Sequence, residues 1–180
     1  MRANDIVPTI LRSLSEGRVL RRATATALRV VAALAVVGAL VDVVLILRLS
    51  FGADDAAATI AGVLLALGVA ACGLVAAQVA WFRAGSVEAL PESQHPMLAI
   101  ASVLLRTTGE IVAACFLILG IFTAVASWIA PRFAGYALAW VPVGVPGASF
   151  TSGFLGGVAI LLACAFTAAV ALAVAYLLAE

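Results

Sequence analysis

The chain has 180 residues, of which 66% are hydrophobic and only 11% are charged, and its mean hydropathy is +1.24. Soluble domains carry about 45–50% apolar and about 25% charged residues, so this composition excludes an ordinary soluble domain and indicates a protein surrounded by lipid. The formal net charge of +1 points to no charged partner, and no basic domain is present that would favour nucleic-acid binding.

The first 24 residues form a basic segment of their own. Apolar side chains recur at helical spacing over residues 6–22, which predicts an interfacial amphipathic helix that attracts anionic lipid. The alternative, compatible with the first, is a basic flank that only sets topology. The basic residues that would face lipid headgroups are Arg12, Arg18, Arg21 and Arg22.

Residues 25–180 predict an all-α integral membrane domain. Crossing about 30 Å of hydrocarbon takes about 20 apolar helical residues, and long runs that are apolar on all sides suit helices better than barrel strands. Four segments qualify, and we expect them to pack as a four-helix transmembrane bundle. They are residues 25–47, 57–82, 98–130 and 155–178.

The arginine distribution predicts the orientation. Eight arginines lie in the flanks on the N-terminal side of the four segments, and only Arg48 and Arg132 lie on the other side. Since cytoplasmic flanks are enriched in basic residues, both termini are expected in the cytoplasm. The all-arginine, alanine-rich composition suggests a GC-rich bacterial genome, and hence a multi-pass protein of the bacterial inner membrane.

The third segment is longer than a single crossing needs, so part of it must leave the hydrocarbon, tilt or break. Pro96 is a plausible first residue of its helix. The loop at 131–153 is apolar and aromatic, and we expect it to cap the bundle or lie on the outer leaflet; a re-entrant loop is the alternative. Expected interfacial residues are Trp81, Arg83, Trp128, Arg132, Tyr136 and Trp140.

Asp42 is the first charged residue expected at membrane depth, where a charge costs about 2.5–3.5 kcal/mol or more. Ala35, Gly38 and Ala39 precede it by seven, four and three residues, and so place the carboxylate on a small-residue face suited to close helix packing. We therefore expect Asp42 to face protein. It is either a structural hydrogen-bonding group or a protonatable, cation-attracting site.

Arg106 and Glu110 are four residues apart on the third segment, close enough to form an ion pair on one helix face. Ser102 extends that face, and Thr107 adds a hydroxyl nearby. If the membrane core is 111–130, the pair lies at the cytoplasmic boundary. If the core begins near residue 98, the pair is buried and is a stronger candidate for a functional site.

Sequence motifs for catalysis and cofactors are missing. Walker, GxSxG and HExxH patterns do not occur, and the spacing of the three cysteines suits neither zinc nor a disulfide framework. We read Cys72, Cys115 and Cys164 as small packing residues. We therefore expect no enzyme activity, no metal and no cofactor.

Two functional hypotheses remain. The first is a non-enzymatic accessory or scaffold subunit, acting as a homo-oligomer or within a larger membrane complex, whose internal charges hold helices together. The second is a small ion channel or ion-coupled transporter in which Asp42, Arg106 and Glu110 line a polar path. No repeat of the kind found in many transporters is evident.

Overall fold

The computed structural model describes residues 18–90, 96–138, 145–146 and 153–180. Within them lie four long helices and one short one: α2 (Arg18–Phe51), α3 (Ala56–Glu88), α4 (Pro96–Ile129), α5 (Pro131–Leu138) and α6 (Gly153–Leu178). The described residues contain no strand. Each long helix is long and apolar enough to cross a membrane, which confirms the predicted all-helical class with four candidate spans.

The helices begin and end where local chemistry requires it. Asp54 has a positive φ of 48° in the α2–α3 turn, and the Asp55 side chain then caps α3 by accepting a bond from the Ala57 amide at 3.0 Å. Pro96 opens α4, where its missing N–H costs no helical bond. Pro131 disfavours helical geometry at Ala130 and so separates α4 from α5.

All four predicted spans are present, and each is longer at one or both ends. The first, expected at 25–47, belongs to a helix that starts at least seven residues earlier, so Arg18, Arg21 and Arg22 belong to α2. The third is one unbroken helix of 34 residues. The amphipathic helix expected at 6–22 lies mostly outside the described residues, and so do Arg12, His95 and Trp140.

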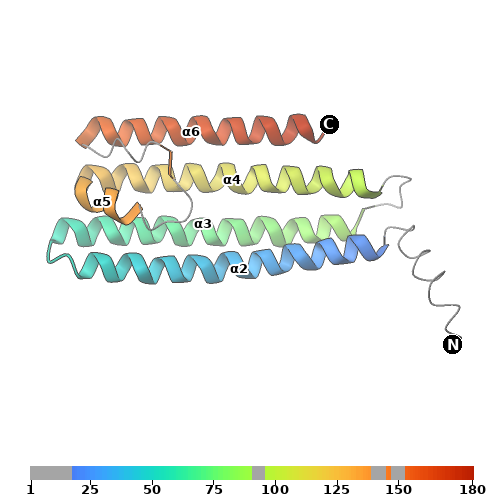
Figure 1. The fold of residues 1–180 in the computed structure, drawn as a ribbon, viewed down its shortest axis with the longest axis horizontal. Coiled ribbons are helices and arrows are strands. Elements are labelled where there is room, and N and C mark those ends of the chain that lie inside the picture. Colours follow the sequence, from blue (N-terminus) through green and yellow to red (C-terminus); the bar gives the residue numbers. More distant parts are fainter. Residues whose placement is uncertain (1–17, 91–95, 139–144, 147–152) are drawn as a thin grey trace, which may run out of the picture.

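The four long helices are arranged as an open row (Figure 1). α2 packs on α3, α3 on α4, and α4 on α6, whereas α2 and α6 lie at opposite edges of the row. The expected bundle is therefore not closed within one chain. In lipid, apolar faces gain little by packing on one another, since the lipid tails solvate them equally well. Close contact between helices is determined by other features, chiefly small residues and polar side chains.

Glycines bring the neighbouring helices of the row together. A Cβ added to Gly73 of α3 would lie 2.3 Å from the Ala39 Cβ of α2, and one added to Gly109 of α4 would lie 2.3 Å from the Ala175 Cβ of α6. Ala171 and Ala175 of α6, four residues apart, pack against Gly109 in this way, whereas Ala165 and Ala169, which have the same spacing, are exposed.

Two groups of buried apolar residues hold the row. The larger group joins α2, α3, α4 and α6 with Ala134 of α5 and with Val145, which lies beyond α5. α5 thus packs at one end of the row, and most of the rest of the 131–153 loop lies outside the described residues. The smaller group joins α2, α3 and α4 near the other end and is formed by Ala25, Leu28, Ala84, Val87 and Ile100. We call this other end the arginine end, because Arg21, Arg22, Arg29, Arg83 and Arg106 lie toward it.

Candidate functional site

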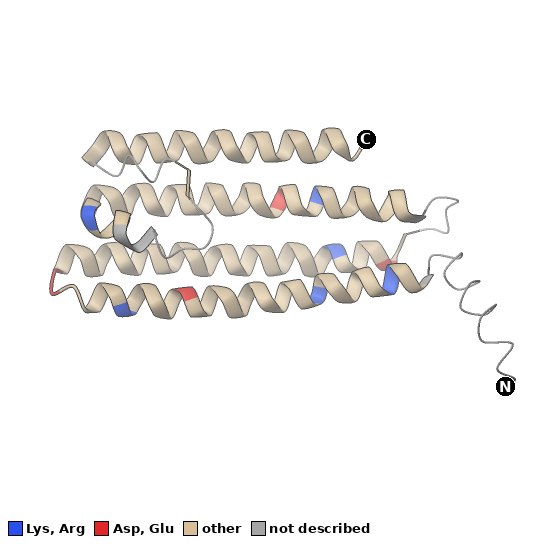
Figure 2. Ribbon diagram, in the orientation of Figure 1, with Lys and Arg blue, Asp and Glu red and all other residues tan. Residues whose placement is uncertain are grey.

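Charged residues mark a belt of the row that carries almost no charge (Figure 2). On α2, Arg29 and Arg48 are separated by about 30 Å at about 1.5 Å per residue, and on α4 the segment from Glu110 to the helix end at Ile129 is of similar length. This length matches a hydrocarbon core of about 30 Å. A bilayer that covered these segments would have Arg83, Arg106 and Glu110 at one boundary and Asp42 inside.

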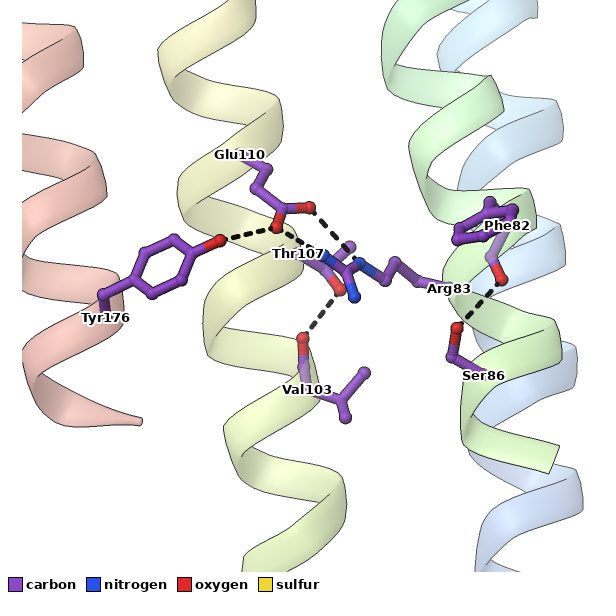
Figure 3. A network of polar contacts seen from close by, with 7 residues as sticks. All are labelled: Phe82, Arg83, Ser86, Val103, Thr107, Glu110 and Tyr176. Carbon is purple, nitrogen blue, oxygen red and sulfur yellow. Dashed lines mark hydrogen bonds and ion pairs between the residues drawn. The ribbon is translucent and has the colours of Figure 1, made fainter. Parts of the chain in front are cut away.

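Glu110 is the centre of a polar network that ties three helices (Figure 3). The Nε of Arg83 on α3 donates to one carboxylate oxygen of Glu110 at 3.2 Å, and its Nη2 contacts the other. The Tyr176 hydroxyl on α6 donates to the same carboxylate at 3.1 Å. The side chains of Arg83 and Glu110 are 28% and 23% exposed, so this two-point ion pair is partly screened from water.

Arg106 lies in the same region and forms no ion pair with the residues that the structure describes. Its guanidinium lies over the Tyr176 ring, 5.4 Å from the centroid, which is a cation–π arrangement. Its Nε is buried and has no hydrogen-bond partner among the described residues. The region therefore holds two guanidinium groups and one carboxylate and carries a net positive charge.

The ion pair predicted between Arg106 and Glu110 is wrong, because Glu110 pairs with Arg83. Both residues lie on one face of α4, as expected, but Glu110 reaches across to Arg83 instead. A two-point bond from a neighbouring helix holds the carboxylate better than an exposed contact along one helix, which contributes only about 0.3–0.5 kcal/mol. Ser102 and Thr107 satisfy their hydroxyls locally, with bonds to Ala99 and Val103 carbonyls at 2.9 and 2.7 Å.

Asp42 has a different environment. It lines a hollow of about 230 Å³ between α2, α3 and α4, with Gly38, Gly73, Cys72 and Cys115 among the other lining residues. Of the expected small-residue face, Ala35 and Ala39 contact α3 at Gly73, whereas Gly38 is exposed, and Asp42 is half-buried. Asp42 makes no hydrogen bond or ion pair with any described residue, so the structural partner considered for it is not found within these ranges.

The cysteines occupy helix contacts. The Sγ of Cys72 donates to the Cys115 carbonyl at 3.6 Å and the Sγ of Cys115 to the Cys72 carbonyl at 3.9 Å, which joins α3 and α4 beside the hollow. Cys164 is buried against Gly120. All three thiols are free, and no three His, Cys, Asp or Glu side chains within the described ranges are arranged to hold a metal.

The expected interfacial residues lie at both ends of the row. Trp128 is 40% exposed, stacks on Phe154 and donates its indole N–H to the Phe154 carbonyl at 3.1 Å. Trp81 is 63% exposed near the arginine end, and Arg132 is exposed in the first turn of α5. The backbone of Tyr136 lies in α5, but its side chain is outside the described set.

Sequence reasoning missed three residues of the arginine end. Tyr176 received no role, Arg83 was expected only as an interface anchor, and Arg29 was counted only as basic flank. Arg29 in fact forms an ion pair with Glu88 at 2.9 Å and lies over the Trp81 ring. An aromatic residue at a helix end is a usable signal for Tyr176, but the pairings depend on helix register, which the sequence does not reveal.

Comparisons of the chain with protein-family models, with curated proteins and with solved structures find no match.

Proposed function

We propose that the chain is a non-enzymatic scaffold or accessory subunit of a membrane assembly, with its arginine end in the cytoplasm. The observation that carries this proposal is the way in which the charged groups are used. Glu110 is held by Arg83 and Tyr176 from two neighbouring helices, so its carboxylate serves to join helices. A carboxylate with these bonds is poorly suited to bind a transported ion. To do so it would have to leave Arg83, and the guanidinium would then be unpaired.

The open row supports an assembly role. Its two outer helices, α2 and α6, bury little of their apolar surface within the chain. Only 11% of the most apolar 18-residue segment is buried in α2, and 22% in α6. Asp42 on α2 has no described partner, although a carboxylate in hydrocarbon is stabilised by a donor. A helix of another subunit, or of a second copy, that offers such a donor would complete the hollow.

The experiment compares the assembly state of two aspartate variants. Asp42→Asn removes the charge inside the belt, and Asp54→Asn makes the same change in the exposed turn, where asparagine also tolerates the positive φ. We expect wild type and Asp54→Asn to elute from a mild detergent as an assembly, and Asp42→Asn as a smaller species. A monomeric wild type with no associated chain contradicts the proposal.

One observation favours the second hypothesis, a small ion channel or ion-coupled transporter. Asp42 is a carboxylate without a described partner in a hollow large enough for several water molecules. Ion flux into liposomes separates the two functions. A channel predicts wild-type flux above that of empty liposomes and a change with Asp42→Asn, whereas a scaffold predicts background flux from both.

A further inference from the structure

A long groove runs along the outer side of the α2–α3 pair at the arginine end. Its deeper part has a volume of about 540 Å³ and is lined mainly by apolar side chains, including those of Ala33, Val36, Ala77 and Trp81. Its outer part, about 460 Å³, shares Arg29, Trp81 and Phe82 with the deeper part and continues to Ser86 and Ala89. Both parts are lined mainly by apolar side chains, and Arg29 and Ser86 add polar groups to the outer part.

Arg29 stands where the two parts of the groove meet. Its guanidinium forms an ion pair with Glu88 at 2.9 Å and lies 5.8 Å from the centroid of the Trp81 ring, yet 41% of the side chain remains exposed. Arg22 is exposed seven residues earlier and hence on the same face of α2. Among the described residues beside the groove, two arginines against one glutamate leave a net positive charge.

The position of the groove along the helices, relative to the membrane boundary, favours one kind of occupant. Arg29 marks the boundary of the charge-poor belt on α2, so the apolar part, toward Val36, extends into the hydrocarbon and the part at Ser86 reaches the headgroup layer. Trp81 and Phe82 are 63% and 74% exposed and flank the groove at this level. Aromatic rings and arginines at a membrane boundary contact lipid headgroups and the first acyl carbons.

We propose that this groove binds one anionic phospholipid, with an acyl chain between α2 and α3 along Ala33 and Ala77 and with its phosphate at Arg29. The phosphate accepts hydrogen bonds from the exposed edge of the guanidinium, and Arg22 adds attraction to a negative headgroup. This site is independent of the proposed assembly role and differs from a general lipid shell, because it requires both a particular charge and an open groove.

The test measures the quenching of Trp81 by brominated phospholipids in nanodiscs. Brominated phosphatidylglycerol, which is anionic, is compared with brominated phosphatidylcholine, and the Trp81 signal is the difference between wild type and Trp81→Phe. We expect phosphatidylglycerol to be preferred by about fivefold in wild type. Arg29→Gln should reduce the preference to about onefold to twofold, and Arg29→Lys should retain most of it.

Two further variants test the specificity of the charge effect and the need for an open groove. Arg48→Gln makes the same substitution at an exposed position toward the opposite end of α2 and should leave the preference unchanged. Ala33→Phe fills the groove from an exposed position and should reduce quenching by both lipids. Equal quenching by both lipids in wild type, or a preference that survives Arg29→Gln with helix content retained, overturns the proposal and leaves only an unselective lipid shell.

Discussion

Two carboxylates on the long helices, Glu110 of α4 and Asp42 of α2, have opposite environments. Glu110 lies at the boundary of the charge-poor belt and is bonded by Arg83 and Tyr176, so its charge is neutralised within the chain. Asp42 lies inside the belt, beside a hollow, with no described partner. The first carboxylate is a structural tie, whereas the second is a group whose partner the chain itself does not supply.

The difference follows from how each position is built. At Glu110 the helices approach at Gly109, which lets Ala171 and Ala175 of α6 pack on α4 and brings Tyr176 within bonding distance. At Asp42 the small residues that allow α2 to approach α3 also leave space next to the carboxylate. Small residues thus bring Tyr176 to Glu110 at one position and leave a hollow beside Asp42 at the other. The following substitutions test this comparison.

Glu110→Ala is expected to have the largest effect. It leaves the guanidinium of Arg83 without its carboxylate in a site where both side chains are about three-quarters buried. We expect the free energy of unfolding to fall by about 2–3 kcal/mol, toward the lower end for a broken buried pair because of partial solvent screening. Unfolding in mixed micelles followed by circular dichroism measures this, and an unchanged midpoint contradicts the structural role.

Gly109→Ala tests the helix approach on which the network depends. The added Cβ would meet Ala175 Cβ at 2.3 Å and the Ala171 carbonyl at 3.1 Å, so α6 has to move away from α4. We expect a loss of about 1–3 kcal/mol. Gly85→Ala is the matched control, since nothing lies within 4 Å of its Cβ position. Equal stability of the two variants contradicts a close α4–α6 contact.

Tyr176→Phe removes one hydroxyl from the network and keeps the ring beneath Arg106. We expect a loss of about 0.5–1.5 kcal/mol, the usual contribution of one hydrogen bond. In the Glu110→Ala background the same substitution should cost less, because the acceptor is already gone. A double-mutant cycle of unfolding free energies measures the coupling, and a coupling near zero excludes the bond between the two side chains.

Asp42→Leu is expected to have the smallest effect on the isolated chain, and of opposite sign. It removes a carboxylate that has no described partner from the apolar belt, so stability in micelles should stay unchanged or rise by up to about 1 kcal/mol. The same unfolding assay serves as readout. A loss as large as that of Glu110→Ala would show that Asp42 is paired within the chain, which would remove the contrast between the two carboxylates.

The sequence determined the class of this protein. Four apolar segments of sufficient length must become helices, because each backbone N–H in lipid requires a partner along its own segment. It also determined where α4 begins, through Pro96, and that Ala35, Gly38, Ala39 and Asp42 share one face. These features are local, since they depend only on composition, on helical periodicity and on the fixed geometry of proline.

Only the tertiary structure decided which helices pack together and which charges pair. Arg106 and Glu110 have the right spacing for an ion pair, yet the register of α3 against α4 brings Arg83 to Glu110, and the end of α6 adds Tyr176. The open row has the same origin. Lipid solvates apolar faces as well as another helix does, so hydrophobicity along the chain selects no neighbour, and contacts such as Gly109 on Ala175 do so instead.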